Sequence, residues 1–364
     1  MIMISDKKLK NSQAWWHVLE DGRVQCDLCP RHCRLKEGQQ GLCFVRGCVN
    51  GEVVLTSYGR STGFCIDPVE KKPLNHFYPG SAALSFGTAG CNLACKFCQN
   101  WDISKSREVD RMSSVAMPEQ IRKAAIDTGC KSVAFTYNDP VIFMEYALDI
   151  ADECHAHDVK TIAVTAGYIS EGPREQFLKG MDATNIDLKG FTEKFYWKLT
   201  GGHLQTVLDT LHYVHHETDV WMEITTLLIP DENDSDKEIS NMCEWLMEHV
   251  GPYVPLHFSA FHPDWKMQDK LPTQQSVLNK ARDIAQGYGL KYVYTGNVHD
   301  KAGQSTYCSG CGQLLIGRDW YELSEWNLDQ QGACKACGVS CHGHFEAKPG
   351  TQGSARQVIN INNY

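Results

Sequence analysis

The sequence contains no uninterrupted run of about 18 apolar residues, which is the length that predicts a membrane-spanning helix. It also lacks the beginning of a secretory protein, because its first eight residues place apolar side chains before charges in too short a stretch. These absences predict a cytoplasmic protein without membrane contact. Apolar content of 42% is ordinary for a globular chain, and 364 residues suffice for one large core with smaller additions.

An excess of positive charge is also missing. The chain carries 35 Lys and Arg against 44 Asp and Glu, for a formal net charge of −9. Proteins that grip nucleic acid usually present basic patches, and no stripe rich in Lys and Arg stands out near the carboxyl-terminal cysteines. We therefore do not expect nucleic acid to be the main partner.

Cysteine, in contrast, is abundant, with 17 residues that fall mostly into three clusters. In a small secreted protein this would predict disulfides, but in a long chain without a signal peptide it predicts metal ligands in a reducing compartment. Five cysteines lie outside the clusters and are expected to be small buried apolar residues: Cys48, Cys65, Cys130, Cys154 and Cys243.

The central cluster is a short loop that contains Cys91, Cys95 and Cys98 and follows an apolar run over 82–87. A structural zinc site would require a fourth ligand nearby, and an ordinary ferredoxin cluster would require four cysteines. Three thiolates on one loop instead suit three irons of a four-iron cubane, which leaves the fourth iron open to a small molecule.

The C-x3-C-x2-C spacing, with the aromatic Phe97 before the third cysteine, resembles the radical S-adenosylmethionine (SAM) superfamily. The resemblance implies a [4Fe-4S] cluster whose open iron binds the amino and carboxylate groups of SAM. It also implies reductive cleavage of SAM to a 5′-deoxyadenosyl radical, which removes a hydrogen atom from a substrate. An electron donor such as flavodoxin or ferredoxin would be a partner.

Strand-like and helix-like patterns alternate from about residue 82 to residue 298, which predicts an α/β fold with a parallel sheet. The resemblance favours a partial (β/α)6 radical SAM barrel over a doubly wound sheet. The strand-like runs are 82–87, 132–136, 160–165, 183–188, 220–228, 254–259 and 291–295. The helix-like runs are 118–128, 141–157, 172–178, 205–216, 236–249 and 274–286.

Parallel α/β folds bind ligands at the carboxyl ends of their strands, so polar residues there are candidates. The segment 136–140 occupies the place of a Gly-Gly-Glu motif in the resembled family and looks like the branch of pyruvate formate-lyase activating enzymes. The resemblance implies that Asn138 and Asp139 contact SAM. Asp139 is shorter than the usual Glu, and the alternative is that its carboxylate caps the following helix. Phe97 and Thr165 complete this part of the expected SAM site.

Strand 183–188 ends with the charged residues Asp187 and Lys189 on one face. Charges in an apolar barrel are costly unless they are paired or used, so the two residues either line the SAM or substrate site or form a structural ion pair. We also expect Glu223 and His262 to contribute to the substrate site.

The amino-terminal cluster contains Cys26, Cys29, Cys33 and Cys43, with Cys48 as an alternative to Cys43. Four thiolates so close together predict a metal site with a structural or electron-relay role. Zinc and a second [4Fe-4S] cluster both accept four cysteines, and the spacing does not separate them.

The carboxyl-terminal cluster consists of two C-x2-C-G pairs, Cys308 with Cys311 and Cys334 with Cys337, and predicts a zinc ribbon. Cys341, His342 and His344 are possible alternative ligands. The expected organisation is a metal-binding region with a connector over 1–80, the barrel over 81–300, the ribbon over 301–345 and a flexible tail over 346–364.

These motifs together resemble the radical SAM protein family of the AmmeMemoRadiSam system along nearly the whole chain, which implies protein partners. The first hypothesis is a radical SAM enzyme that acts on a small molecule or a protein, including activation of a glycyl-radical enzyme. The alternatives are a radical SAM enzyme that modifies RNA and a metal-binding scaffold without catalysis, which a test for SAM cleavage would distinguish.

Overall fold

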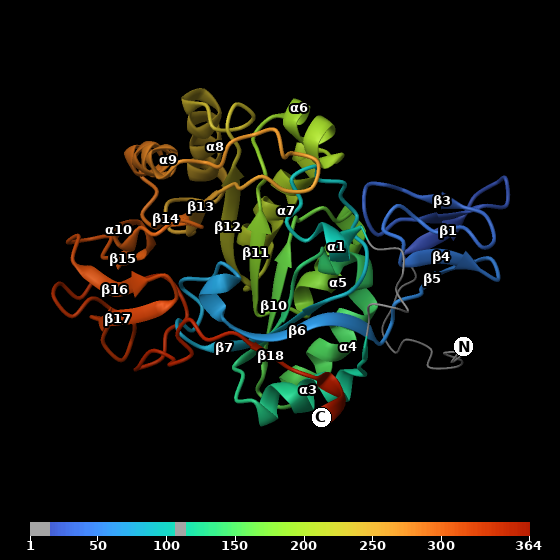
Figure 1. The fold of residues 1–364 in the computed structure, drawn as a ribbon, viewed down its shortest axis with the longest axis horizontal. Helices are drawn as coiled ribbons and strands as arrows, with labels where there is room; N and C mark the ends of the chain where they lie inside the picture. Colours follow the sequence, from blue (N-terminus) through green and yellow to red (C-terminus); the bar gives the residue numbers. More distant parts are fainter. Residues whose placement is uncertain (1–14, 106–113) are drawn as a thin grey trace.

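A computed structural model describes residues 15–105 and 114–364, so the start of the chain discussed above lies outside the described residues. Its main feature is a mixed sheet with seven consecutive parallel strands in the described chain, arranged in the order β7-β9-β10-β11-β12-β13-β14 (Figure 1). Their bounds are Ala82–Gly87, Ser132–Phe135, Lys160–Thr165, Ala183–Asp187, Trp221–Leu228, Leu256–Ala260 and Val293–Gly296. The predicted parallel α/β fold is confirmed, and within the described residues the sheet stays open at β14.

Helices follow the strands and pack one apolar face each against the sheet (Figure 1). Ser235 begins α8 by accepting a hydrogen bond from the Glu238 backbone N–H, and Pro118 occupies the first position of α3, where its missing N–H costs nothing. The predicted run 141–157 begins with the short helix η2, Pro140–Phe143, before α4. The helices are α3 (Pro118–Asp127), α4 (Met144–His155), α5 (Glu171–Lys179), α7 (Leu204–Glu217), α8 (Asp236–His249) and α9 (Gln275–Gly287).

Two small cysteine-bearing units lie on opposite sides of the barrel (Figure 1). The amino-terminal unit combines a three-stranded sheet with a hairpin, and the carboxyl-terminal unit is a three-stranded antiparallel sheet. The first contains β1 (Trp16–Val18), β2 (Val24–Cys26), β3 (Arg34–Leu35), β4 (Arg46–Val49) and β5 (Glu52–Leu55). The second contains β15 (Thr306–Tyr307), β16 (Leu314–Asp319) and β17 (Glu322–Trp326).

The end of the chain is not the flexible tail that the sequence predicts. Residues Gln357–Val358 form β18, which pairs antiparallel with β6 (Arg60–Pro68) at the edge of the main sheet. Ile359 and Ile361 then enter the core, and the Gln120 side chain donates a hydrogen bond to the Ile361 carbonyl oxygen. Burial of two isoleucines and the added strand pairing offset the entropy of ordering this segment.

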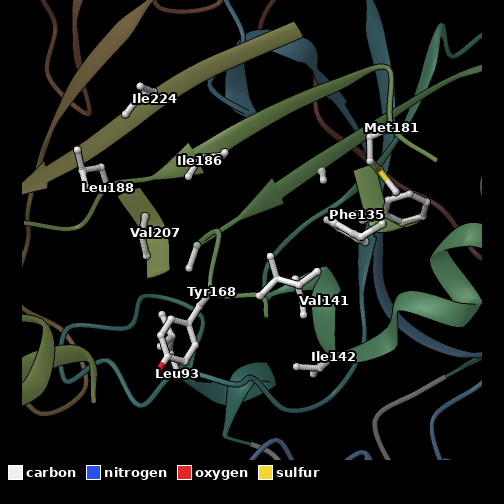
Figure 2. Close-up of a cluster of buried hydrophobic side chains, with 14 of the residues drawn as sticks. Leu93, Phe135, Val141, Ile142, Tyr168, Met181, Ile186, Leu188, Val207 and Ile224 are labelled. Carbon is white, nitrogen blue, oxygen red and sulfur yellow. The ribbon is translucent and has the colours of Figure 1, made fainter. Parts of the chain in front are cut away.

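The barrel core extends up to the loop of Cys91, Cys95 and Cys98. Leu93 from this loop packs beside Tyr168, which follows β10, and both side chains are almost fully buried (Figure 2). The Asn92 amide donates a hydrogen bond of 2.8 Å to the Tyr168 carbonyl oxygen. The loop is therefore anchored to the carboxyl ends of the strands.

No helix of the described chain is both long and apolar enough to span a membrane.

Candidate functional site

The cysteine loop begins at the carboxyl end of β7, and Asn138 fixes its first turn. The Asn138 side-chain oxygen accepts the Thr88 backbone N–H at 3.2 Å, and its nitrogen donates to the Gly90 carbonyl oxygen at 2.8 Å. Gly90 has a φ of 87° and packs so closely against the amino-terminal unit that an added Cβ would lie 1.9 Å from the Cys43 carbonyl oxygen. Only glycine meets both requirements.

The thiols of Cys91, Cys95 and Cys98 lie close enough for their charges to interact. Burial raises the pKa of Cys95 to about 12, the nearby Lys189 ammonium opposes this rise, and the Cys98 and Cys91 thiols add to it. Cys98 Sγ also lies 3.1 Å from Ser104 Oγ, so its position is defined by the short helix α1, Trp101–Ser104. The donor set of three convergent thiols fits three irons of a four-iron cluster.

Asp187 and Lys189 form an ion pair near the cysteine loop. Lys189 Nζ lies 2.8 Å from Asp187 Oδ2 at the end of β11, and the Lys189 backbone N–H donates to the Tyr196 hydroxyl. Burial lowers the pKa of Lys189, but the charges of Asp187 and Cys95 raise it more, so its pKa lies above the usual range. The ion pair and the proximity to the cysteine loop therefore occur together, although the sequence suggested them as alternatives.

Asp139 and Thr165 are engaged in bonds that shape the strand ends. Asp139 accepts hydrogen bonds from the Val141 and Ala166 backbone N–H groups and from the Thr165 hydroxyl, at 2.9 to 3.1 Å. Its carboxylate caps η2, as the alternative interpretation expected. Phe97 is buried against Phe195 under the loop. Contacts of these side chains with SAM remain predictions.

Glu223 and His262 are not brought together. Glu223 is the third residue of β12 and lies toward the amino end of that strand, where its carboxylate accepts bonds from His257, from the Trp221 indole and from the backbone N–H groups of 75 and 76. These bonds favour a scaffold role. His262 is exposed after β13, in a segment that contacts the cysteine loop through a bond from the Trp101 indole to Asp264.

A polar cavity of about 300 Å³ opens beside the cysteine loop. Gln99 and Asn100, directly after Cys98, form one wall, and the ends of three strands form another through Thr136, Ser259 and Asn297. The remaining walls come from the segment after β6 and from the carboxyl-terminal unit, through Glu70, Arg318 and their neighbours. Its position suits a substrate that must approach the cysteine loop.

The four carboxyl-terminal cysteines form a compact group whose sulfur atoms all lie within 4.8 Å of one another. The Cys308–Cys337 and Cys311–Cys334 sulfur distances are 3.5 and 3.8 Å. A tetrahedral zinc ion with Zn–S bonds of about 2.3 Å requires sulfurs roughly 3.8 Å apart, so the geometry fits one such ion.

The three other candidate ligands near this group lie outside it. Cys341 Sγ lies 3.8 Å from His76 Nδ1, the His342 ring stacks on Tyr253, and His344 packs against Phe77. In the part of the chain that the structure describes, the compact group contains only the four predicted cysteines.

The amino-terminal cysteines Cys26, Cys29, Cys33 and Cys43 line one cavity. Cys48 is instead buried away from it, with Sγ 3.6 Å from Glu37 Oε2, so Cys43 is the fourth member of the set.

Sequence reasoning did not find Arg31 or Lys105. Arg31 Nε donates to the Asn92 carbonyl oxygen, and Lys105 Nζ to that of Leu93. No local pattern marks a basic side chain that reaches across the fold.

Comparison with known proteins gives a consistent class. Residues 86–243 match the Radical SAM superfamily. The chain is 38% identical over 325 residues to the uncharacterized protein MJ0808 of Methanocaldococcus jannaschii, covering 89% of this chain and 96% of that protein. It is 27% identical over 195 residues to a pyruvate formate-lyase-activating enzyme of Clostridium pasteurianum, covering 50% of this chain and 80% of the enzyme.

Among solved structures, Streptococcus suis SuiB bound to the precursor peptide SuiA is similar over 64% of this chain and 52% of that chain, with a TM-score of 0.49 and 15% identity. The chain belongs to the radical SAM superfamily and is a radical SAM enzyme with relatives among pyruvate formate-lyase-activating enzymes. Membership implies a [4Fe-4S] cluster, SAM and a source of electrons.

Proposed function

We propose that Cys91, Cys95 and Cys98 hold the [4Fe-4S] cluster and that the enzyme removes a hydrogen atom from a substrate bound in the adjacent polar cavity. The observation that carries this proposal is that the three cysteines lie on one loop, which Asn138 and Asn92 anchor at the carboxyl ends of the strands near the Asp187–Lys189 ion pair. The bound cluster and SAM would together supply a 5′-deoxyadenosyl radical.

The protein's own contribution is to position and enclose these groups. Asn138 sets the turn before the cysteine loop, and Leu93 with Tyr168 closes the apolar side beneath it. Lys189 places a positive charge beside thiolates that carry negative charge once they bind iron, which stabilises the ligated state. Asp187 holds that ammonium and presents its partly exposed carboxylate to the site.

For the substrate we propose a protein, in the manner of an activase. The similarity to pyruvate formate-lyase-activating enzymes supports this, because their name states that they act on another enzyme. Protein partners of the AmmeMemoRadiSam type and a flavodoxin-like or ferredoxin-like donor belong to the same proposal. We further propose that Cys308, Cys311, Cys334 and Cys337 bind one structural zinc ion, since their sulfur spacing fits it.

The test is anaerobic reconstitution followed by measurement of 5′-deoxyadenosine with a reductant, alone and with candidate partner proteins or RNA. We expect product from the wild type and a strong increase with a protein substrate. A Cys91→Ala/Cys95→Ala/Cys98→Ala variant should lose it, whereas Cys130→Ala, which removes a buried cysteine outside the clusters, should retain it. Unchanged 5′-deoxyadenosine formation in the triple variant would disprove the assignment. If RNA alone increased 5′-deoxyadenosine formation, RNA would replace a protein as the proposed substrate.

A further inference from the structure

The amino-terminal cysteines enclose a space that differs in size from the carboxyl-terminal metal group. In the described chain, the four sulfurs of the group at 308–337 all lie within 4.8 Å of one another. No three sulfurs among Cys26, Cys29, Cys33 and Cys43, which the structure also describes, are that close together. Nevertheless, all four cysteines line the same cavity. In any three of these cysteines, at least one pair of sulfurs is therefore more than 4.8 Å apart, although all four residues line one cavity.

The distances between the sulfurs distinguish the two metal centres that four thiolates can bind, a single zinc ion and a [4Fe-4S] cluster. One zinc ion draws its sulfurs to roughly 3.8 Å from one another, as at the carboxyl-terminal group. In a cubane each thiolate binds a different iron, so the sulfurs stand farther apart than around a single ion. In the described chain, the sulfurs of Cys91, Cys95 and Cys98 likewise do not all lie within 4.8 Å of one another.

The walls of the cavity supply positive charge. Arg31 lines it, and its Nη2 atom is buried without a hydrogen-bond partner, which is costly unless an acceptor occupies the cavity. Arg46 is also in the wall and is buried, held by Glu145 and by the Ile142 carbonyl oxygen. Four thiolates around either metal carry net negative charge, so these arginines support a bound metal centre and the spacing decides which one.

The same cavity adjoins the central cysteine loop. Asn92, the residue after Cys91, is part of its wall, and Arg31 Nε donates a 2.9 Å hydrogen bond to the Asn92 carbonyl oxygen. Gly90 is in contact with the Cys43 backbone. The backbone N–H of Ser170, after β10, donates to the Leu28 carbonyl oxygen. Two cysteine loops that are distant in sequence thus share an interface.

We infer that Cys26, Cys29, Cys33 and Cys43 bind a second [4Fe-4S] cluster, not zinc, next to the SAM cluster. All four irons have a cysteine ligand there, so this cluster has no open iron for SAM. The comparison of the amino-terminal sulfur spacing with that of Cys91, Cys95 and Cys98 rests on the proposed function. The comparison with the sulfur spacing around a zinc ion does not depend on it.

The experiment measures iron, sulfide and zinc per chain in anaerobically reconstituted full-length protein, with electron paramagnetic resonance after reduction. The Cys91→Ala/Cys95→Ala/Cys98→Ala variant should keep about four irons, from one cluster, out of about eight in the wild type. Its reduced signal should not change when SAM is added. This variant leaves the amino-terminal unit untouched, so its folding does not depend on altering the site under test.

The reciprocal variant is Cys29→Ala/Cys33→Ala, which removes the two half-buried members of the set. It should lose about four irons, from one cluster, and keep a signal that responds to SAM. Cys48→Ala, in the same unit but outside the cavity, is the matched control and should retain all the iron. A triple variant without iron that contains one more zinc than the carboxyl-terminal group explains would overturn the inference. If the triple variant instead kept all the wild-type iron, the assignment of Cys91, Cys95 and Cys98 would fail.

Discussion

The ammonium group of Lys189 lies 2.8 Å from a carboxylate oxygen of Asp187, and the same ammonium faces the thiol of Cys95. An ion pair in this position can act on the cysteine loop as well as on the stability of the barrel. The side chain of Asp187 is about one-third exposed, so solvent screens part of its attraction to Lys189. The exposed part of the carboxylate is accessible to a ligand.

Replacement of Asp187 by Asn should therefore affect SAM more than folding. We expect roughly ten-fold weaker SAM binding, as follows from losing one charge-assisted hydrogen bond, and a melting temperature within about 5 °C of the wild type. Isothermal titration and thermal unfolding of the same reconstituted protein provide the comparison. Asp236→Asn, in an exposed pair with Lys280, is the matched control. A large loss of stability with unchanged SAM affinity would assign the pair to the scaffold.

The carboxyl-terminal group should bind one zinc ion. A Cys334→Ser/Cys337→Ser variant should lose that ion and unfold the unit at lower temperature, because a closed four-thiolate site contributes folding free energy. Metal analysis and the iron-dependent absorbance should show zinc lost and iron retained. Cys341→Ser, outside the compact group, should keep zinc. Equal zinc in the double variant and the wild type would contradict the assignment.

Stability should depend on pH through His76, a residue that no sequence pattern singled out. Its Nδ1 donates to the His342 carbonyl oxygen, and its Nε2 is hydrogen-bonded to the Tyr294 hydroxyl in the interior of the protein. Burial lowers the pKa of His76 to about 4, although the nearby Glu223 charge opposes this. Because the unfolded histidine binds its proton near pH 6.5, the unfolded state binds more protons below that pH, and stability falls as the pH decreases.

The expected loss between pH 6.5 and 4 is about 3 kcal/mol of unfolding free energy from this group alone. Urea unfolding across this window should show a shallower slope for His76→Asn than for the wild type. Other groups also contribute to the pH dependence of stability, so the difference between the two proteins is the informative quantity. An identical slope in both would show that His76 titrates normally in the folded state.

Much of this architecture follows from patterns that are local in the sequence. The alternation of strand-like and helix-like runs predicted the parallel sheet, because strands such as β9 and β13 are buried on both faces and helices connect them. What the pattern could not show is position across the fold. Glu223 stands near the amino end of its strand although the carboxyl ends were expected to carry the site, and Arg31 reaches Asn92 over 61 residues of chain. The spacing of the amino-terminal cysteines left zinc and a second [4Fe-4S] cluster open, because the distances between their sulfurs are set by the fold.

The contact between Gly90 and Cys43 offers a direct test of how the two cysteine loops depend on each other. In a Gly90→Ala variant the new Cβ would lie 1.9 Å from the Cys43 carbonyl oxygen and 3.0 Å from its carbon, so one loop must move. The residue also has a φ of 87°, where any side chain adds strain. Gly129→Ala is a matched control, because Gly129 has a φ of 70° with nothing within 4 Å of the added Cβ.

We expect Gly129→Ala to cost about 1 kcal/mol of unfolding free energy from backbone strain alone, and Gly90→Ala to cost distinctly more. The larger effect should appear at the metal sites. Because the displaced Cys43 is a proposed ligand of one site and Gly90 precedes Cys91, a proposed ligand of the other, Gly90→Ala should lower iron occupancy at both, with a weaker SAM-responsive signal and less total iron. Normal iron in Gly90→Ala, with a stability equal to that of Gly129→Ala, would show that the two loops hold their metals independently of this contact.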